Sequence, residues 1–586
     1  MTYTSSKHQF IPFLGIHLAF TALVMSIIIL FNELPFILIF LHLSILFSLY
    51  FLTYVFCQTV LINAPLVKIL LFSLVSFFIF WLYILNTLAL NYWGSTVTFS
   101  FIWLYLCQIN SLLEDIPFAL LLVLIVAISV FCLFFKFYNR HVVFSEAKPS
   151  WGDFKVYYIF SFVVMLNVFI SFDPKDPKIW EGEFITNLVL NSTGIHHLYT
   201  PKILIPIKKN DKKIRPNIIY IHLDAMRSDH MSAYGYYRNT TPYIDKLLEH
   251  GAEKITVATS ICSESICGMV AALGSNFIDK LPNKFELLHH QLKKYGYKNN
   301  FIGVGNFSWG GFDNIIQGGI DLFSRSDQQS DYSIHDDFYI INELNKLPQS
   351  KNKENFFFLR YLSSHPIGKH FNRYRKYTPS QKNVFSYLLP SLDDEVAINA
   401  YDNNTLQADD LVQRSLSILK AKGYLENYIL VIYGDHGDAL GEHGYFGHYT
   451  GLYQEEIGVP MIFASNKAIG LSLKEYASIL DIAPTILDFV DIPIPKQYIG
   501  ISLFSEVENH PLTFHSSRTG VYSVIYQTNN KLYKYIYYRK AQKANELYEL
   551  FSDPKERNNV IGSVSGNISL YLEEQLIGYF QLETEL

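Results

Sequence analysis

The stretch Ile429–His448, ILVIYGDHGDALGEHGYFGH, decides the fold predicted for this chain. Its first five residues are apolar and mostly β-branched, which predicts a buried strand, and the chain then breaks into a glycine-rich loop. Asp435 and His436 follow at the carboxyl end of that strand, and His448 lies on the returning loop. Ligands of open α/β sheets bind beyond the carboxyl ends of strands. Carboxylate and imidazole side chains at this position suit zinc or manganese.

A second acidic strand end of the same design occurs upstream. Residues Pro216–Leu223, PNIIYIHL, predict another buried strand, and Asp224 follows it directly. The later segment TSICSESICGM predicts a loop at Cys262–Ser265 and an apolar helix from about Ile266. Small nucleophilic side chains at a helix N-terminus gain from the free N–H groups and the helix dipole. A thiol or hydroxyl that attacks an anion would be placed there.

Strand and helix patterns alternate through the rest of the soluble part. The strand predicted at Phe356–Leu362 ends at Ser363, Ser364 and His365, and an amphipathic helix is predicted at Asn404–Lys422. Further elements are predicted as a strand at 457–464 and a helix at Leu480–Val490. Such alternation predicts a doubly wound α/β domain with helices on both faces of the sheet. Asp224, Cys262, His365 and Asp435 would then meet at one rim.

The apolar residues of this chain are concentrated at its N-terminus. Half of the 586 residues are hydrophobic, and the excess lies in the first 172. Five stretches are long enough, or nearly so, to span a bilayer. They are approximately Phe10–Phe31, Pro35–Cys57, Ile69–Leu90, Pro117–Phe137 and Phe154–Phe172. A sixth apolar stretch, Val97–Leu112, carries polar residues and is interpreted as a partly buried or interfacial helix. We therefore expect a five-span transmembrane domain over residues 1–172.

Charge distribution orients the predicted spans. Lysine and arginine gather at one set of span ends, which places the N-terminus in the cytoplasm by the positive-inside rule. Five crossings leave the remainder outside. Residues 173–213 are interpreted as a linker, with a membrane-surface helix around Trp180–Leu198, and residues 214–586 as an extracytoplasmic catalytic domain. The net charge of −5 is small, and no motif suggests nucleic-acid binding or a protein partner.

Several motifs together resemble the sulfatase and phosphoethanolamine transferase branch of the alkaline phosphatase superfamily. IIYIHLDAMRSDHMSAYGYYRNTTPYIDKL is similar to the family's first metal-binding strand, and YGDHGDALGEHGYFGH to the second. SILDIAPTILDFVDIPIP and ELYELFSDPKERNNV resemble the closing elements of sulfatase-type domains. The resemblance covers roughly Pro216–Val560 and keeps the family's motif order. The five-span N-terminal part is similar to that of phosphoethanolamine transferases in architecture alone.

The resemblance assigns expected roles residue by residue. It implies metal ligation by Asp224, Asp435 and His436, and it places His365 near the transferred group. His448 matches the histidine after the second metal motif, and either histidine would protonate the leaving alcohol. Lys369 and His370 either line the substrate groove or are solvated. Zinc is the expected metal, with manganese or calcium as alternatives.

The nucleophile stays open among three residues. Cys262 falls where the family's nucleophile sits and would also ligate the metal as a thiolate. A disulfide between Cys262 and Cys267 is the alternative, since the domain is expected outside the cytoplasm, and Ser263 or Ser265 would then attack. The sulfatase signal for conversion of cysteine to formylglycine is absent, because Glu264 and Ile266 replace its proline and arginine.

The resemblance implies a bacterial inner-membrane enzyme with a periplasmic catalytic domain. The expected reaction transfers phosphoethanolamine or phosphoglycerol from a membrane phospholipid donor to an envelope lipid or glycan acceptor, through a covalent enzyme intermediate. A spanning domain favours a donor held in the bilayer, although fold analogy alone does not identify a substrate. Two alternatives remain: a sulfuric ester hydrolase, and an envelope-binding protein without catalysis.

Overall fold

The computed structural model describes residues 214–586, apart from gaps at 283–284, 308–310, 329–334, 351–353, 381–393, 449–450, 473–474, 508, 518–519, 529, 540–542, 565 and 583–586. It also describes a few residues between 66 and 136. The chain divides into two units, Met1–Ile195 and His196–Leu586. Within the described residues, no helix has the length and apolar character needed to cross a bilayer. The predicted linker and nearly all residues of the predicted spans lie outside the described residues.

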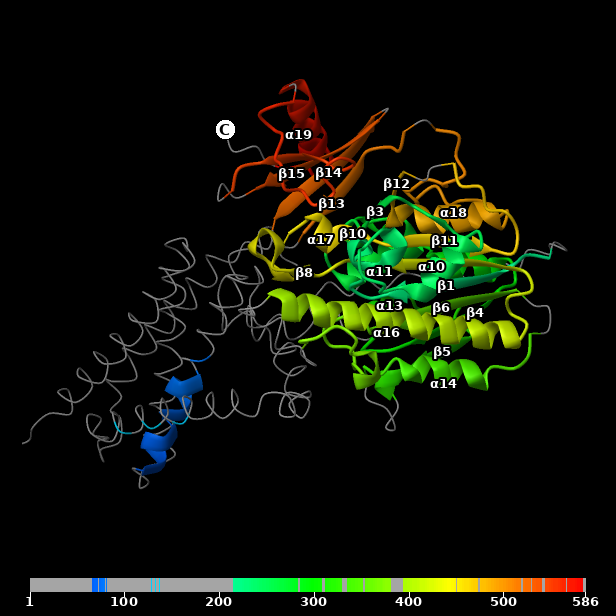
Figure 1. The fold of residues 1–586 in the computed structure, drawn as a ribbon, viewed down its shortest axis with the longest axis horizontal. Helices are drawn as coiled ribbons and strands as arrows, with labels where there is room; N and C mark the ends of the chain where they lie inside the picture. Colours follow the sequence, from blue (N-terminus) through cyan, green and yellow to red (C-terminus); the bar gives the residue numbers. More distant parts are fainter. Residues whose placement is uncertain are drawn as a thin grey trace, which may run out of the picture. The chain divides into compact units, whose positions relative to one another are not determined.

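A seven-stranded sheet forms the centre of the larger unit (Figure 1). Its strand order is β2-β11-β7-β1-β6-β4-β5. Strands β7, β1, β6, β4 and β5 run parallel, and β11 pairs antiparallel with β7 at one side. The bounds are β1 Asn217–Leu223, β2 Glu253–Lys254, β4 Lys298–Gly303, β5 Leu322–Arg325, β6 Asn355–Tyr361, β7 Tyr428–Gly434 and β11 Met461–Ser465.

Alternation along β1 divides its side chains between two hydrophobic cores. Ile218 and Tyr220 belong to one core, while Ile219 and Ile221 belong to the other. Successive side chains of a strand point to opposite faces, so a strand buried on both faces reads as a continuous apolar run. Every residue of β1 is buried, as this reasoning requires.

Helices cover both faces of the sheet. The first core includes side chains of α11 (Ser265–Gly274), α12 (Leu288–Lys294) and α18 (Ile482–Phe489). The second includes side chains of α10 (Pro242–Glu249), α14 (Phe338–Lys346) and α16 (Asp394–Ala421). Figure 1 shows α14 and α16 on one side of the strands and α18 on the other. The predicted doubly wound α/β domain is confirmed.

Two predicted elements differ in detail from the structure. The strand predicted at 457–464 is split into β10 (Gly458–Val459) and β11, and β10 pairs with β3 (Val257–Thr259) in a separate three-stranded sheet. Pro460 between them lacks the N–H that would continue the ladder. The helix predicted to begin at Asn404 begins at Asp394.

A second, antiparallel sheet completes the C-terminal part. It has the order β13-β14-β15-β16, with bounds Thr513–Ser516, Val521–Thr528, Lys531–Tyr538 and Glu546–Glu549, and α19 (Gly566–Phe580) packs on it. Lys534 Nζ lies 2.8 Å from Glu556 Oε1, and both side chains are fully buried. Glu556 Oε2 accepts a hydrogen bond from the Gln454 backbone, and its carbonyl lies 3.0 Å from His443 Nε2. The C-terminal sheet thereby holds the loop that follows β7.

His515 makes the folded state sensitive to acid. Its ring is fully buried, and burial together with the charge of Lys534 lowers its pKa to about 3. The unfolded chain takes up this proton near pH 6.5, so the stabilising contribution is present above that pH and is lost as pH falls toward 3. Each pH unit within that window should cost about 1.4 kcal/mol of unfolding free energy. Unfolding curves of wild type and His515→Gln should differ in pH slope between pH 7 and 5. Equal slopes would contradict this.

Candidate active site

Three neighbouring parallel strands end at the same level of the sheet. Leu223, the last residue of β1, pairs in register with Tyr361 of β6 and with Gly434 of β7. The residues that follow these positions therefore lie side by side. They are Asp224 after β1, and Asp435 and His436 after β7. All three are fully buried.

Backbone contacts fix the Asp435 carboxylate. Its Oδ1 accepts hydrogen bonds from the N–H groups of Ala225 (3.1 Å) and His436 (2.9 Å). Ala225 adopts a φ of 56°, in the left-handed region that non-glycine residues seldom occupy. Such local strain is characteristic of functional sites. The other oxygen, Oδ2, accepts no well-aligned hydrogen bond and remains available to a further ligand.

Asp224 is held from both sides. Its Oδ2 accepts a hydrogen bond of 2.7 Å from Arg360 Nη2, and its carbonyl accepts one of 2.7 Å from Ser364 Oγ. Burial alone would raise the pKa of Asp224, but the positive charges of Arg360 and His436, with a hydrogen bond from His436, outweigh burial and hold the pKa well below its usual range. Asp224 is therefore a carboxylate at neutral pH, with Oδ1 directed to the rest of the site.

Ser265 lies between Asp224 and His436. Its Oγ is 3.2 Å from Asp224 Oδ1 and 3.0 Å from His436 Nε2. It is the first residue of α11, where the backbone N–H groups of the first turn have no partner within the helix. Of the three nucleophile candidates, Ser265 is thus the one that contacts the acidic strand ends.

The structure corrects the preferred role of Cys262. Its sulfur is bonded to Cys267 in a disulfide, with an S–S distance of 2.06 Å. A disulfide sulfur carries neither a thiol proton nor a thiolate charge, so Cys262 can be neither the nucleophile nor a thiolate ligand in this form. Ser263, the third candidate, is buried but makes no hydrogen bond to Asp224, Asp435 or His436. Ser265 lies between the two cysteines of the disulfide in sequence.

His436 presents one defined nitrogen to the site. Its Nδ1 donates to the carbonyl of Gly437 at 2.7 Å, which leaves Nε2 facing Asp224 and Ser265. Burial would lower its pKa, but Asp435 and Asp224 outweigh burial and raise the pKa to about 10. Two buried carboxylates therefore hold a positive charge at this point.

Two further histidines stand beside His436. The ring of His448 lies 4.5 Å from that of His436 and 5.1 Å from that of His365, centre to centre. His448 Nδ1 donates to Asp438 Oδ1 at 2.8 Å, which orients the ring. Burial, more than the charges of the neighbouring histidines, lowers the pKa of His365 to about 3. His365 is consequently neutral at neutral pH, and its Nδ1 accepts from the Ile367 N–H, so its proton is on Nε2.

The donor set fits a divalent cation. His436 Nε2 lies 3.5 Å from Asp224 Oδ1 and 3.8 Å from Asp435 Oδ2, and Ser265 Oγ lies within 3.2 Å of the first two. Ligand atoms at about 2.0–2.2 Å from a tetrahedral ion are about 3.3–3.6 Å apart. Asp435 Oδ2 accepts no well-aligned hydrogen bond from the described residues. These residues could hold zinc or manganese in place of the proton on His436.

His222 offers a second nitrogen behind Asp435. One donor atom each from His222, Asp224 and Asp435 fall within 4.8 Å of one another. His222 Nε2 is 3.0 Å from Asp435 Oδ2, and its ring stacks on Tyr433 within the sheet. A nitrogen in that position orients the carboxylate that binds the ion. We therefore favour His436 as the ligand and His222 as its support.

The sequence interpretation missed two residues that shape the site. Arg360, within the apolar run of β6, pairs with Asp224. Asp337 accepts hydrogen bonds from the backbone of Leu362 and Ser363 and from Ser363 Oγ, and so fixes the turn that carries His365. The charged residue in an otherwise apolar strand was the available signal for Arg360. Asp337 lies before a helix and gave no signal.

Gly268 permits α11 to approach β7. A Cβ atom added at this residue would lie 2.4 Å from the carbonyl oxygen of Asp435. Because this neighbour is backbone, it cannot move without shifting the site. Gly268→Ala should cost about 1–3 kcal/mol of unfolding free energy and weaken zinc binding. Thermal melting with and without zinc would measure both effects. The exposed Gly562→Ala, where a Cβ meets nothing and the backbone φ is not positive, is a control for added bulk. An unchanged zinc response in Gly268→Ala would contradict the close contact.

Parts of this chain match two protein-family models. The sulfatase family model matches residues 216–492, and a model of the N-sulphoglucosamine sulphohydrolase C-terminal region matches residues 441–580. Residues 216–492, somewhat less than half of the chain, are therefore similar to the sulfatase family. The confirmed resemblance includes relatives of both the sulfatase and the phosphoethanolamine transferase kinds.

Two relatives represent the two kinds. An N-acetylglucosamine-6-O-sulfatase of Bacteroides thetaiotaomicron is 31% identical over 176 residues, which cover 28% of this chain and 31% of the relative. The phosphatidylethanolamine transferase Mcr-1 of Escherichia coli is 23% identical over 318 residues, which cover 51% of this chain and 58% of the relative. The chain thus spans about a third of the sulfatase and over half of the transferase.

Two solved structures are also similar to parts of this chain. The soluble domain of lipooligosaccharide phosphoethanolamine transferase A from Neisseria meningitidis has a TM-score of 0.42 and 17% identity, covering 50% of this chain and 92% of that one. A 2-O GAG sulfatase has a TM-score of 0.47 and 17% identity, covering 62% and 90%.

Proposed function

We propose that this chain is a membrane-anchored, metal-dependent transferase of the sulfatase superfamily. It moves phosphoethanolamine or phosphoglycerol from a phospholipid to an envelope lipid or glycan on the periplasmic side of the inner membrane. The observation that carries the proposal is the position of Ser265. Its hydroxyl lies at a helix N-terminus, within 3.2 Å of a buried carboxylate and a buried imidazole. A covalent intermediate on Ser265 would divide the transfer into two displacements.

The disulfide favours transfer over sulfate hydrolysis. A sulfatase of the formylglycine type converts one cysteine into formylglycine. The cysteine at the matching position here, Cys262, is bonded to Cys267 and is not available for this conversion. A serine nucleophile suits a phosphoryl group. The imidazole of His436 among the donors favours zinc or manganese over calcium. The five predicted spans would bring a lipid donor and the site together at the bilayer surface.

Each residue of the site has a separate role in the proposed reaction. A divalent cation held by Asp224, Asp435 and His436 would supply positive charge to the phosphoryl oxygens and lower the pKa of the attacking hydroxyl. Ser265 Oγ loses its proton and forms a bond to phosphorus as the phosphorus–oxygen bond to the lipid breaks. The N–H groups at the start of α11 face the oxygens on which charge develops.

A histidine side chain transfers the proton at the leaving oxygen. His365 is neutral and has its proton on Nε2, and His448 is oriented by Asp438. His448 takes the proton that leaves Ser265 Oγ and gives it to the departing alcohol, while the neutral His365 donates a hydrogen bond from Nε2 to a phosphoryl oxygen. In the second displacement an acceptor hydroxyl gives up its proton, forms the new bond to phosphorus, and returns Ser265 to its free form. His448 takes that proton and returns it to Ser265 Oγ.

Mass spectrometry of the peptide with Ser265 tests the proposal. The full-length protein would be incubated with phosphatidylethanolamine and zinc, then reduced and digested. We expect a phosphoethanolamine-sized increase on Ser265, absent after chelation and absent in Ser265→Ala. A phosphoglycerol-sized increase with phosphatidylglycerol would select the other donor. An unmodified Ser265 with both donors would overturn the proposal.

A sulfuric ester hydrolase is the second candidate. The match of residues 441–580 to a sulphohydrolase C-terminal region and the 31% identity to a sulfatase favour it. It requires a free Cys262 and its conversion to formylglycine, which would appear as a mass loss on the same peptide. Release of sulfate from an aryl sulfate, unaffected by Ser265→Ala, would establish this alternative.

A further inference from the structure

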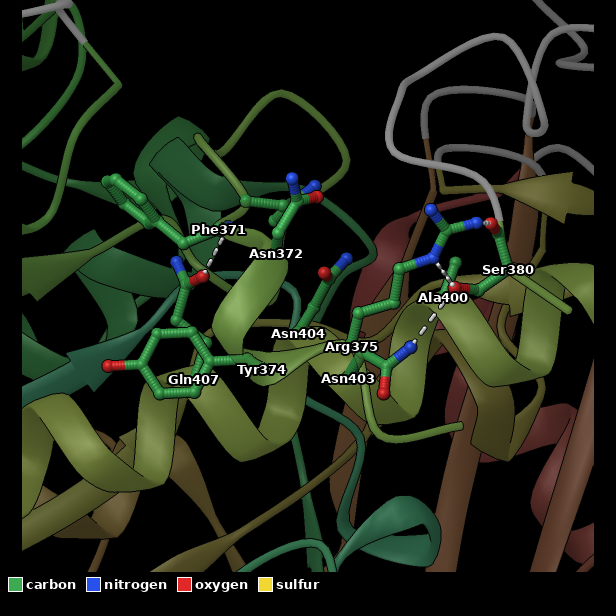
Figure 2. Close-up of a pocket in the computed structure, with 10 residues that line it drawn as sticks. Phe371, Asn372, Tyr374, Arg375, Ser380, Ala400, Asn403, Asn404 and Gln407 are labelled. Atoms are coloured by element: carbon green, nitrogen blue, oxygen red, sulfur yellow. Dashed lines mark hydrogen bonds between the residues drawn. The ribbon is translucent and has the colours of Figure 1, made fainter. Parts of the chain in front are cut away.

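A short segment packs on α16 just after the turn that carries His365. It runs from Lys369 to Ser380 and is held at two places by side chains of the helix. Gln407 Oε1 accepts a hydrogen bond from the Phe371 N–H at 3.0 Å, a contact that Figure 2 shows. Asn403 Oδ1 accepts two more from the segment, at 2.9 and 2.8 Å. Because Asn403 and Gln407 are about one helical turn apart, the segment runs along the helix.

The outer side of this segment is strongly basic. Between Lys369 and Ser380 there are four lysines and arginines and no acidic residue, in a chain whose net charge is −5. Lys369, Arg373, Arg375 and Lys376 are all exposed. No described carboxylate forms an ion pair with the last three of these side chains. The segment therefore presents positive charge to solvent that the described residues do not neutralise.

Aromatic rings lie among these charges. The Cζ atom of Arg373 is 5.3 Å from the ring centre of Phe371 and 4.9 Å from that of Tyr374. Lys376 Nζ is 5.2 Å from the ring centre of Tyr377. All three rings are half-buried, so part of each is open to solvent. Cation–π contacts thus hold the charged groups beside apolar surface.

A second exposed ring and cation extend the same surface. Tyr237 is 78% exposed. The Cζ atom of Arg238 lies 5.2 Å from the Tyr237 ring and 4.9 Å from the Tyr377 ring, and Tyr377 Oη donates to the Asn239 carbonyl at 3.0 Å. We call Tyr237, Arg238 and Lys369–Tyr377 the basic-aromatic face. Three carboxylates that border this face already have partners, namely Asp336 with Lys369, Asp402 with Arg238, and Asp410 with Arg414.

We propose that the basic-aromatic face docks on the surface of a bilayer that contains anionic phospholipids. Lysine and arginine side chains are attracted to such a surface over about one Debye length. Tyrosine has an apolar body and a polar tip, which suits the headgroup layer. A soluble polyanion would use the charges but leave the Tyr237 ring in water, so the rings favour a lipid surface. The proposal concerns the surface beside the active site and holds whichever group the site transfers.

Docking would keep the active-site turn near the lipid. Gln407 Nε2 donates to Ser363 Oγ at 2.9 Å and to the Lys369 carbonyl at 2.8 Å. One side chain of α16 therefore ties the beginning of the basic-aromatic face to the turn that carries His365. A domain bound through this face would hold that turn close to the headgroup layer.

A nitroxide attached at Tyr237→Cys reports docking directly. The full-length chain would also carry Cys57→Ala, Cys107→Ala and Cys132→Ala, and would be held in phosphatidylcholine nanodiscs with or without about 30% phosphatidylglycerol. Accessibility to oxygen and to a water-soluble nickel chelate distinguishes lipid from water. We expect the oxygen-to-nickel ratio to be at least about twofold higher with phosphatidylglycerol at about 0.05 M salt. The difference should disappear at about 1 M salt, where charges are screened within about 3 Å.

Removal of the unpaired charges tests which residues dock. Arg373→Gln, Arg375→Gln and Lys376→Gln together should lower the ratio of docked to undocked protein about 100-fold. The matched control removes three exposed lysines near the amino ends of the parallel strands, at the opposite edge of the sheet, and should leave docking unchanged. These lysines are Lys298 at the start of β4, Lys420 near the end of α16, and Lys467 after the antiparallel strand β11.

Each outcome decides for or against the face. A nitroxide equally accessible in both kinds of nanodisc at low salt would overturn the proposal, even if the charge variants fail to fold. An equal loss of docking in the control variant would also overturn it, because net charge alone would then account for the effect. Protection of the nitroxide by dextran sulfate, without any effect of phosphatidylglycerol, would assign the face to a soluble polyanion instead. Absence of the Ser265 adduct would overturn the transferase alone.

Discussion

Ser265→Ala should lower the rate of group transfer by about a thousandfold or more, because the variant has no oxygen to form the covalent intermediate. The hydroxyl lies 3.0–3.2 Å from His436 and Asp224, so alanine removes the attacking atom without changing the volume of the site much. Transfer of a labelled headgroup from phosphatidylethanolamine, measured at saturating zinc, gives the rate. Zinc binding should persist in the variant, because three of the four donors remain.

Ser263→Ala is the matched control for this prediction. Ser263 is also buried and lies two residues away, but it does not contact the acidic strand ends. Its replacement should leave the rate within about a factor of three. If Ser263→Ala abolishes transfer and Ser265→Ala does not, the assignment of the nucleophile is wrong.

Arg360→Met should destabilise the metal-free protein by about 3–5 kcal/mol. The side chains of Arg360 and Asp224 are 8% and 0% exposed, with 2.7 Å between Nη2 and Oδ2. Removal of one partner of a buried ion pair leaves an uncompensated charge in a poorly solvated place. Zinc would then neutralise Asp224 alone, so zinc should raise the melting temperature more in the variant than in wild type. Thermal melting in the presence of chelator and of zinc measures both quantities.

Arg325→Met separates this effect from the general loss of a buried arginine. Arg325 is 9% exposed and pairs with Asp313 and Asp327, away from the metal donors. Its replacement should lower stability with no change in the response to zinc. If zinc shifts the melting temperature equally in Arg360→Met and wild type, Arg360 does not neutralise the metal-binding carboxylate.

The sequence was sufficient to predict β1, β6 and β7 of the central sheet, because these strands are apolar runs. The register that aligns Leu223 with Gly434 was not predicted, and it places both carboxylates at one edge of the sheet. Side chains whose roles depend on contacts between distant parts of the chain were harder to predict. Arg360 and Asp337 act through contacts with residues far away in sequence, and no local pattern indicates such contacts.

The choice of the nucleophile was also difficult to predict from the sequence. Cys262, Ser263 and Ser265 occupy one short loop, and the sequence ranked them by their similarity to a family pattern. The structure distinguishes them by the direction of each side chain, because α11 begins at Ser265 and turns its hydroxyl toward Asp224. The disulfide was recognised as an alternative, but spacing alone could not show that it forms.

The contacts of Glu556 have a consequence for the order in which the protein matures. The loop after β7 carries His443 and is followed by Gln454, and both bond to Glu556, which follows the last strand of the C-terminal sheet. A chain grows from its N-terminus, so the sheet and the acidic strand ends exist before their support does. The site should therefore acquire its final geometry only after Glu556 has been synthesised and has packed beside the C-terminal sheet. A chain that has not yet grown to Glu556 would lack this support.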